Sequence, residues 1–267
     1  MKITMLGTGN ALVTKYYNTC YVLDDAGRTI LVDGGGGNGL LRQLELAGYR
    51  WEDMREIIVT HRHIDHLLGI IWMMRMICEF MNEGTYLGEA NIYAHDEVIA
   101  LLRELAGKLL KKKENRFVDD RLHLVEVHDG ETREISGQKV TFFDIGSTKA
   151  KQYGYCLDLG DGKRLTCCGD EPCGEPGRKY AAGSTWLLHE AFCLDGQAEI
   201  YHPYEKHHST VKDAAELGAK LGVENLLLYH TEDGTYGERK KLYLAEGKQY
   251  FSGSLYVPDD LETVTLT

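Results

Sequence analysis

The first half of the chain alternates short apolar runs with amphipathic stretches. Apolar runs of strand length, bounded by turn residues, predict strands at Ile3–Leu6, Cys20–Leu23, Thr29–Val32, Ile57–Thr60 and Asn91–Ala94. Apolar residues at helical spacing predict helices over Leu40–Ala47, Leu67–Met81 and Asp96 to about Leu110. A glycine-rich stretch, Gly34–Gly39, separates the third strand from the first helix. Strands and helices are therefore mixed from the start of the chain.

The second half opens with strands and then alternates again. Strands dominate from Leu122 to Gly169. The elements that follow are predicted as strand, helix, strand and helix over Trp186–His189, Ser209–Leu221, Asn225–Tyr229 and Glu238–Lys248. No linker and no sequence repeat divides the chain. We therefore expect a single α/β domain over residues 1–267, with sheets covered by helices.

Composition narrows the class of protein and its surroundings. A hydrophobic content of 43% with 27% charged residues is typical of a globular protein with a sizeable core. The net charge of -11 disfavours binding driven by contacts to a nucleic-acid backbone, because each phosphate contact needs a lysine or arginine. No apolar run approaches the roughly 20 residues that span a bilayer, so we expect no membrane contact. An odd number of cysteines, seven, without a disulfide framework favours a reducing cytoplasm.

A dense cluster of histidine and aspartate follows the fourth predicted strand. The segment reads His61-Arg62-His63-Ile64-Asp65-His66. In extended backbone, residues i and i+2 project to the same side, so the imidazoles of His61 and His63 point to one place. A turn after His63 brings Asp65 and His66 to a second place nearby. Imidazole and carboxylate are suited to zinc, manganese or iron, so the cluster predicts a metal site rather than a solvated loop.

Two further residues of ligand type end apolar strands far from this cluster. Asp170 follows Leu165–Gly169, and His230 follows Leu226–Tyr229. Either one alone is more often the cap of a strand than a ligand. Ligands collect at the carboxyl ends of strands in layered α/β folds, and these two join the first cluster there. We therefore predict a metal centre with His61, His63, Asp65, His66, Asp170 and His230.

At this point the chain resembles the metallo-β-lactamase superfamily, whose hallmark HxHxDH reads HRHIDH here. The resemblance runs nearly the whole length and is closest to the ribonuclease Z branch. The supporting segments are LGTGNA from Leu6, LVDGGGG from Leu31, CCGDE from Cys167, LHEAF from Leu188, HHST from His207 and LLLYH from Leu226. It implies a four-layer αββα sandwich and a metal-dependent hydrolase that uses a metal-bound hydroxide, with one or two zinc ions.

The resemblance also implies a role for each site residue. His61 and His63 would hold the first metal, whereas Asp65, His66 and His230 would hold the second, with Asp170 bridging. Asp65, Glu190 and His208 are the residues expected to serve the reaction. Glu190 and His208 match a pair that assists proton transfer to the leaving group, although Glu190 could instead be a simple surface acid.

Two departures from the family pattern change the expectations. The family has another histidine for the first metal, where Gly146 or Ser147 stands here. His202 or His207 is a candidate replacement. Only 22 residues separate Ser147 from Asp170, which leaves no room for a long arm that grips transfer RNA. With the acidic charge, this predicts a small-molecule substrate and not transfer RNA. A homodimer is suggested only because ribonuclease Z-like proteins are often dimers.

The glycine-rich segment also fits a different interpretation. Gly34–Gly39 fits the GxGxxG pattern of nucleotide folds, but no acidic residue ends the next strand, so we expect no organic cofactor. A turn beneath the metals explains the glycines better, with Asp33 supporting a ligating histidine. The leading function is hydrolysis of a phosphodiester or another phosphoryl substrate. Hydrolysis of a carboxylic ester, lactone or amide, and a binding module without turnover, remain as alternatives.

Overall fold

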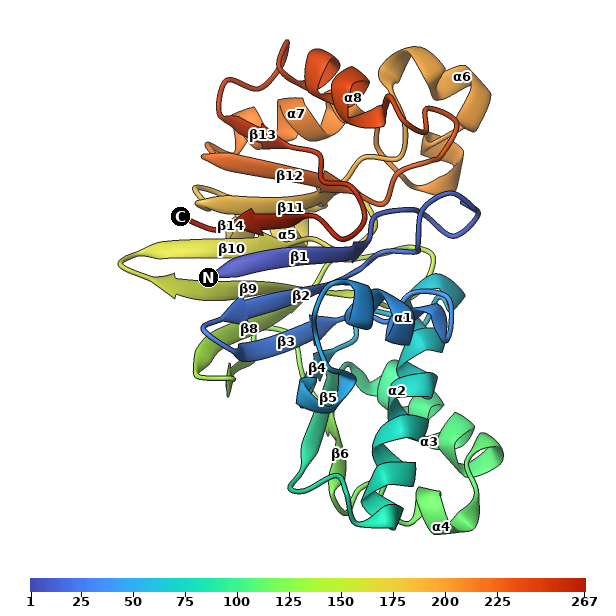
Figure 1. Cartoon of the computed structure of the whole chain (residues 1–267). Coiled ribbons are helices and arrows are strands. Elements are labelled where there is room, and N and C mark those ends of the chain that lie inside the picture. The colour runs from blue at the N-terminus through green and yellow to red at the C-terminus, as the bar shows by residue number, and fades with distance from the viewer.

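Two seven-stranded sheets face each other in the computed structural model, which describes residues 1–267 (Figure 1). The strands of the first sheet, in spatial order, are β14 (Thr263–Thr265), β1 (Lys2–Gly7), β2 (Cys20–Asp25), β3 (Arg28–Val32), β4 (Glu56–Ile58), β5 (Ala90–Ala94) and β6 (Leu122–Glu126). Those of the second sheet are β13 (Ser254–Tyr256), β12 (Asn225–Tyr229), β11 (Trp186–Glu190), β10 (Lys163–Cys167), β9 (Tyr153–Gly160), β8 (Gln138–Asp144) and β7 (Thr132–Ile135). Because β1 pairs with β14, the two chain ends lie side by side.

Helices lie on the outer sides of both sheets (Figure 1). On the side of the first sheet they are α1 (Gly39–Leu46), α2 (Ile64–Glu83), α3 (Asp96–Leu109) and α4 (Lys112–Asn115). On the side of the second sheet they are α5 (Glu175–Ala181), α6 (Ala198–Tyr201), α7 (Val211–Lys220) and α8 (Arg239–Gly247). Three short 3₁₀ helices complete the chain: η1 (Trp51–Asp53), η2 (Asp195–Gln197) and η3 (Tyr204–Lys206).

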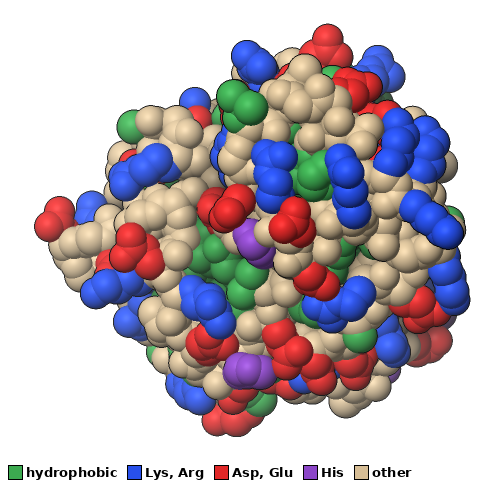
Figure 2. All heavy atoms as spheres, turned by 90° about the horizontal axis from the view of Figure 1, so that it is seen from below, with side chains coloured by type: hydrophobic (Ala, Val, Ile, Leu, Met, Phe, Trp, Pro, Cys, Tyr) green, Lys and Arg blue, Asp and Glu red, His purple; other side chains and the backbone are tan.

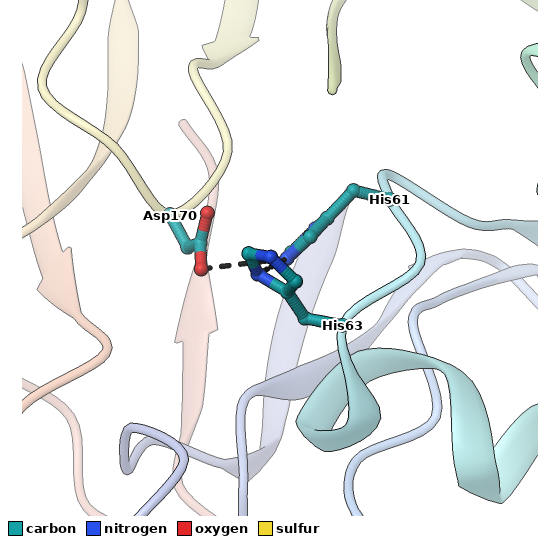
Figure 3. Close-up of side chains that lie close together, drawn as sticks. All are labelled: His61, His63 and Asp170. Atoms are coloured by element: carbon teal, nitrogen blue, oxygen red, sulfur yellow. Dashed lines mark hydrogen bonds and ion pairs between the residues drawn. The ribbon is translucent and has the colours of Figure 1, made fainter. Parts of the chain in front are cut away.

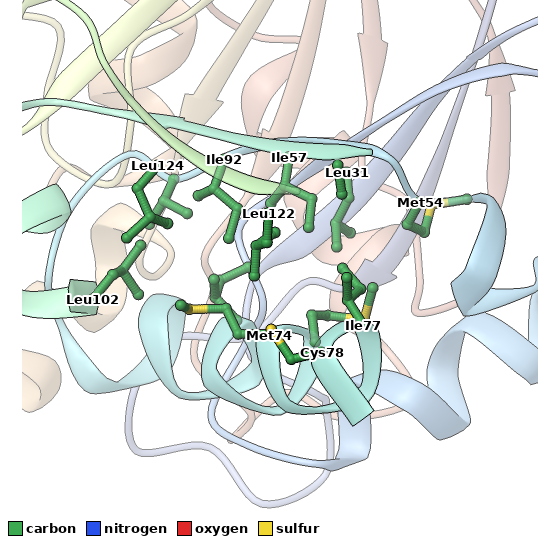
Figure 4. Packing of buried hydrophobic residues seen from close by; sticks show 14 of the residues in the cluster. Leu31, Met54, Ile57, Met74, Ile77, Cys78, Ile92, Leu102, Leu122 and Leu124 are labelled. Carbon is green, nitrogen blue, oxygen red and sulfur yellow. The ribbon is translucent and has the colours of Figure 1, made fainter. Parts of the chain in front are cut away.

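Three separate hydrophobic clusters hold these layers together. A cluster of 28 buried residues fills the space between the first sheet and its helices, where Ile57 and Ile92 face Met74 and Ile77 (Figure 4). A second cluster of 23 residues lies between the two sheets, and a third of 17 lies between the second sheet and its helices. Each fully buried side chain of this kind contributes about 1.5–3 kcal/mol. Three cores between four layers confirm the predicted αββα sandwich.

The helix after the histidine cluster begins earlier than predicted. The apolar pattern placed its start at Leu67, whereas α2 begins at Ile64, with the extended backbone of His63 preceding it. Asp65 and His66 therefore lie in the first helical turn, where a carboxylate suits the positive end of the helix dipole. Helix α5 was not predicted at all, because its sequence, EPGRKYA, combines proline and glycine and has little apolar periodicity.

The glycine-rich loop after β3 packs directly beneath the start of α2. The Gly34 amide donates to the His66 carbonyl at 2.8 Å, and the Gly69 amide donates to the Gly35 carbonyl at 3.1 Å. A Cβ on Gly69 would lie 1.8 Å from the Gly34 oxygen, so only glycine fits this crossing. The predicted close turn under the histidine cluster is present, and it positions α2 against the loop.

Parallel strands bring the carboxyl ends of several elements to one edge of the sandwich. β3 and β4 run parallel in the first sheet, as do β10, β11 and β12 in the second. The segments that follow β4, β10 and β12 carry His61, Asp170 and His230.

No helix combines the length and apolar character needed to cross a membrane. All seven cysteines are free.

Candidate metal centre

The six predicted ligands come together at this edge as two groups. The ligand atoms within each group lie within 4.8 Å of one another, and the groups are His61, His63 and Asp170, then Asp65, His66 and His230. Five of the six side chains are buried, and His63 is half-buried. Sequence proximity explains only the four residues from His61 to His66, after β4 and at the start of α2. The packing of the second sheet against the first brings Asp170 and His230 to them.

The first group joins the segment after β4 to the segment after β10. In Figure 3, the imidazoles of His61 and His63 point toward the carboxylate of Asp170 from the opposite side. His61 Nε2 lies 3.5 Å from Asp170 Oδ2 and 2.9 Å from His63 Nδ1. The extended backbone of His63 allows the two rings to converge, as the i, i+2 spacing predicted.

The second group shares the same aspartate oxygen. Asp170 Oδ2 lies 3.7 Å from His66 Nε2 and 3.6 Å from His230 Nε2, in addition to its contact with His61. Asp65 Oδ2 lies 3.5 Å from His66 Nε2 and 3.4 Å from His230 Nε2. One carboxylate therefore faces both groups, which is the arrangement of a bridging ligand.

These separations fit divalent ions of the size of zinc. Nitrogen and oxygen ligands at zinc–ligand distances near 2.0–2.1 Å are about 3.4 Å apart when the geometry is tetrahedral. The observed separations of 3.4–3.7 Å agree, and only the 2.9 Å between His61 and His63 is shorter. His66 Nε2 is buried and makes no hydrogen bond, an arrangement that a metal ion would satisfy. The residues present therefore fit a pair of ions.

Asp33, directly after β3, connects the two groups from behind. Its Oδ2 lies 2.8 Å from His66 Nδ1 and accepts a hydrogen bond of 2.8 Å from Thr60 Oγ1. Thr60 Oγ1 in turn lies 2.9 Å from His61 Nδ1. Each ring is thus held by its Nδ1, which leaves Nε2 to face the site. The predicted contact of Asp33 with one of the candidate ligand histidines is present.

Replacing Asp33 by asparagine is expected to weaken zinc binding by about 10–100-fold. The φ of Asp33 is +57°, a conformation that asparagine tolerates, so the loop should keep its shape while the negative charge behind His66 is lost. Competition with a fluorescent chelator measures the affinity. The exposed Asp120, changed to asparagine, serves as control, and equal affinity in both variants would contradict this role.

Gln152 is a member of the site that the sequence did not reveal. Its Nε2 donates to Asp170 Oδ1 at 2.6 Å and lies 3.0 Å from His61 Nδ1. An isolated β-bridge between His61 and Gln152 holds the two backbones together. Glutamine is not a metal-ligand type, and its position just before β9 carries no motif. Its role in orienting Asp170 depends entirely on the packing of the two sheets.

The electrostatics of the two groups differ in the absence of metal. Burial, together with the neighbouring His61, lowers the pKa of His63 to about 4. Burial also lowers the pKa of His66, but the carboxylates of Asp65 and Asp33 outweigh it and raise that pKa well above its ordinary value. The shifts therefore favour the neutral form of His63 and the protonated form of His66.

Metal binding at pH 7 is expected to release more protons from the wild type than from the Asp33→Asn variant, because the carboxylate of Asp33 raises the pKa of His66 and a ligand must be deprotonated. Calorimetric titration of the metal-free protein in two buffers of different ionisation enthalpy counts the protons. The sign follows from the direction of this shift, since a raised pKa keeps more of the His66 ring protonated before an ion binds. In the Asp33→Asn variant the release should decrease, and an unchanged value would contradict the assignment.

Glu190 and His208 lie beside the second group, although Glu190 is not a surface acid. The Glu190 side chain is fully buried, and its Oε1 accepts hydrogen bonds of 2.6 Å from both the amide and the hydroxyl of Ser209. Its Oε2 lies 3.6 Å from His208 Nδ1, and neither atom has another partner. The ring centroids of His208 and His230 are 5.2 Å apart.

Neither Gly146 nor Ser147 replaces the histidine that the family pattern has for the first metal. Gly146 has a φ of +74° in the turn after β8. The hydroxyl of Ser147 donates to Glu171 Oε1 at 2.6 Å, away from the ligands. The first group therefore consists of three side chains, which is the number that catalytic zinc sites use when one position stays open.

The suggested replacement by His202 or His207 was wrong. Both residues are exposed, and neither belongs to a ligand group. His202 Nδ1 lies 3.5 Å from Glu205, and His207 Nδ1 lies 3.1 Å from the Thr148 hydroxyl. Both residues have a positive φ, at the ends of α6 and η3, so their side chains follow the turn geometry of that loop.

A cavity of about 410 Å³ opens onto both groups. His63, Asp65, Asp170 and His230 line it together with His208. The candidate proton-transfer residue and the ligands therefore face the same space, which is the arrangement a hydrolase needs.

The chain is similar to proteins of known families and to solved structures. The family model described as Anti-Pycsar protein Apyc1 matches residues 1–251. Ribonuclease Z of Thermococcus onnurineus is 24% identical over 315 residues, covering 99% of this chain and 94% of the relative. The metallo-β-lactamase fold protein YhfI from Bacillus subtilis has a TM-score of 0.77 at 19% identity over 98% of both chains. Human tRNase Z, short form, has a TM-score of 0.73 at 19% identity over 100% of both chains.

These relatives contradict the prediction of a small-molecule substrate and the exclusion of transfer RNA. Proteins named Ribonuclease Z and tRNase Z match the chain over nearly its whole length. Net charge is an average over the surface and does not describe a local site. In Figure 2, lysine and arginine side chains lie between acidic ones on the face seen from below. Neither the net charge nor the short segment before Asp170 is therefore a reason to exclude transfer RNA as a substrate.

The family match and the fold agree with the resemblance seen in the HRHIDH segment. Because the relatives are named as enzymes, the alternative of a binding module without turnover is set aside. The match to the family covers more than nine-tenths of the chain. The fold and the relatives are those of the ribonuclease Z branch. The chain belongs to the family of the anti-Pycsar protein Apyc1, and it is a ribonuclease Z-like metallohydrolase with the metallo-β-lactamase fold.

Proposed function

We propose that this chain hydrolyses phosphodiester bonds with two zinc ions held by His61, His63, Asp65, His66, Asp170 and His230. The observation that carries the proposal is the single oxygen of Asp170 that lies 3.5–3.7 Å from three imidazoles of both ligand groups. Paired divalent ions joined by a carboxylate are characteristic of enzymes that cleave phosphate esters. Related proteins are named for ribonuclease activity, which supports the same bond type.

When bound, the ions would supply a nucleophile by lowering the pKa of water and would neutralise the charge that develops on phosphorus. The protein keeps the ligands in place. Gln152 holds one oxygen of Asp170, which leaves the other to face both groups. Asp33 and Thr60 hold the imidazoles from behind, so little reorganisation is needed when an ion or a substrate arrives.

We assign the proton that reaches the leaving oxygen to His208. Buried Glu190 has one oxygen occupied by Ser209, and its free Oε2 lies 3.6 Å from His208 Nδ1. A carboxylate at that position holds the ring through Nδ1, which leaves Nε2 to donate into the cavity. The Phe192 ring stacks on His208 with centroids 4.8 Å apart and limits its rotation.

The proposed function is tested by metal analysis together with a substrate panel. Protein purified without chelator should contain about two zinc ions per chain. The panel contains bis(p-nitrophenyl) phosphate, short ribonucleotides, a 3′-extended transfer RNA, a carboxylic ester and a lactone. Hydrolysis of phosphodiesters alone, lost on chelation and restored by zinc, is the expected result. Turnover of the ester or lactone with no turnover of any phosphodiester would overturn the proposal.

Replacing His208 by alanine is expected to lower kcat for a ribonucleotide substrate by about 10²–10⁴-fold, the usual contribution of a general acid. The same change should have a much smaller effect on bis(p-nitrophenyl) phosphate, because nitrophenolate leaves without a proton. Zinc content should stay unchanged, since His208 belongs to neither ligand group. The Glu190→Gln variant should show the same pattern with a smaller loss.

A matched control separates proton transfer from damage to the fold. His207 is exposed and lies next to His208 in the chain, so a His207→Ala variant should keep full activity on both substrates. Equal losses on both substrates in the His208→Ala variant would argue against a role at the leaving oxygen. A fall in zinc content would point to metal binding instead.

We also propose that the protein works in the cytoplasm. All seven cysteines are free, and six of them are buried as small core residues. Proteins of oxidising compartments tend to pair their cysteines, so unpaired thiols in this number favour a reducing environment.

A further inference from the structure

We propose that the hydroxyl of Tyr229 is a positioning group for the metal centre, because it fixes the peptide that carries the bridging residue Asp170. Tyr229 ends β12 directly before the ligand His230, and its hydroxyl donates a hydrogen bond to the carbonyl of Gly169, directly before Asp170. One side chain therefore joins the two segments that supply ligands from the second sheet. The inference rests on the metal centre of the proposed function, but not on the identity of the substrate.

The hydroxyl of Tyr229 belongs to a chain of polar groups buried between the two sheets. The other members are Tyr155, Tyr21 and Cys167, and none of the four residues is more than 2% exposed. The hydroxyls of Tyr155 and Tyr21 are 2.8 Å apart, and Tyr21 donates to Cys167 Sγ at 3.3 Å. Cys167 Sγ lies 3.4 Å from the Tyr229 hydroxyl. Apolar residues alone could fill this interior, whereas buried hydroxyls are stable only when each one keeps a partner.

Only one direction of proton donation satisfies every member of this chain. Tyr21 gives its single hydroxyl proton to Cys167, so Tyr155 is the donor toward Tyr21. Tyr229 gives its proton to the Gly169 carbonyl, so the thiol of Cys167 donates to the Tyr229 oxygen. Each donor in such a chain polarises the next one and strengthens the bond that it makes. The interior of the protein therefore directs its last hydrogen bond at the loop of the bridging aspartate.

The peptide between Gly169 and Asp170 depends on this bond for its orientation. Its carbonyl accepts no other hydrogen bond, and its amide donates none within the protein. Gly169 has a φ of +77°, and a Cβ there would lie 2.7 Å from Gln152 Nε2, so the loop needs glycine, which also leaves its backbone the most freedom to rotate. Without the Tyr229 hydroxyl the buried carbonyl would lack a partner, and its peptide would turn toward another donor. That rotation would move the side chain of Asp170.

Two contacts thus hold Asp170 at complementary points. Gln152 Nε2 donates to its Oδ1 at 2.6 Å and orients the carboxylate. The hydroxyl of Tyr229 holds the backbone of the same residue. Tyr229 itself pairs with Glu190 where β12 lies beside β11, so the hydroxyl extends from a strand inside the sheet. The separation of 3.6 Å between Asp170 Oδ2 and His230 Nε2 depends on both contacts.

The experiment compares two variants of the full chain that each remove one buried hydroxyl. Tyr229→Phe removes the bond to Gly169, whereas the matched Tyr21→Phe variant removes two bonds of the same chain and leaves the bond to Gly169 in place. The metal-free proteins are titrated with cobalt(II), whose visible absorption reports the geometry of its ligands. Zinc affinity is measured by competition with a chelator, and melting temperatures check that both variants fold.

The Tyr229→Phe variant is expected to bind zinc about tenfold more weakly than wild type, the size of effect usual for residues that orient metal ligands. Its cobalt spectrum should differ from that of wild type, because Asp170 is no longer fixed. The Tyr21→Phe variant should match wild type in zinc affinity and in cobalt spectrum, although its melting temperature falls by about 5 °C. Replacing Tyr229 with 4-aminophenylalanine, which keeps a donor at the same place, should restore both the affinity and the spectrum.

The outcomes separate a positioning role from a role in the stability of the fold. Equal losses of zinc affinity in the Tyr229→Phe and Tyr21→Phe variants would mean that the chain only stabilises the interior, and would overturn the proposal. A Tyr229→Phe variant with the affinity and spectrum of wild type, or one that does not fold, would overturn it as well. So would a 4-aminophenylalanine variant that regains its melting temperature without regaining its affinity. Wild-type protein that binds neither cobalt nor zinc would instead overturn the proposed metal centre itself.

Discussion

Replacing Asp170 by alanine is expected to lower kcat/KM for phosphodiester hydrolysis by about 10³-fold or more, equivalent to at least 4 kcal/mol of transition-state stabilisation. The reason is geometric, because one oxygen of Asp170 faces His61, His66 and His230 in both ligand groups. Its loss should weaken metal binding at both groups. Steady-state kinetics and metal analysis by mass spectrometry measure the two effects on the same preparation.

The His63→Ala variant should behave differently and so serves as the comparison. His63 belongs only to the first group, so this variant should retain about one ion per chain and lose activity to a similar extent. The exposed Asp120, changed to alanine, controls for the loss of a carboxylate elsewhere. Full activity or a full complement of two ions in the Asp170→Ala variant would sink the proposed centre.

Removing the metals is expected to lower the melting temperature by about 10 °C. The six ligands are contributed by distant segments, so ions that bind only the folded chain stabilise it by about 4 kcal/mol at a thousandfold excess over Kd. For a chain of this size each kcal/mol corresponds to roughly 2–4 °C. Differential scanning calorimetry before and after treatment with chelator measures the shift, and added zinc should reverse it.

The Asp170→Ala variant provides the internal control for this shift. If it binds no metal, its melting temperature should be insensitive to chelator. A large shift in that variant would mean that the stabilising ions bind elsewhere in the molecule. Wild-type protein that melts at the same temperature with and without chelator would mean that the centre does not hold ions tightly.

Much of the fold follows from local pattern. The strand Asn225–Tyr229 was predicted with its observed bounds, because four residues of strand character stand between polar Asn225 and His230. Start positions of helices were less accurate, as with α2, since apolar periodicity marks the buried face and not the first turn. Helix α5 was missed because its stability comes from packing against β8, β9 and β10 rather than from its own sequence.

The sequence by itself determined the type of chemistry. The i, i+2 spacing of His61 and His63 and the helix that follows them already direct four ligand side chains to adjacent places, because backbone geometry alone sets those directions. The strand-end positions of Asp170 and His230 indicated where further ligands come from. These are short-range properties, so they can be read without knowing how the sheets pair.

The tertiary structure alone decided how these parts meet. Asp65 and His230 are 165 residues apart in the chain, and only the pairing of strands in two packed sheets brings them to 3.4 Å. The same packing positions Gln152 on Asp170 and joins the loops of Lys149 and Lys206. Contacts of this kind depend on sheet order and on the close approach of loops, which hydrophobic burial fixes collectively and no local spacing encodes.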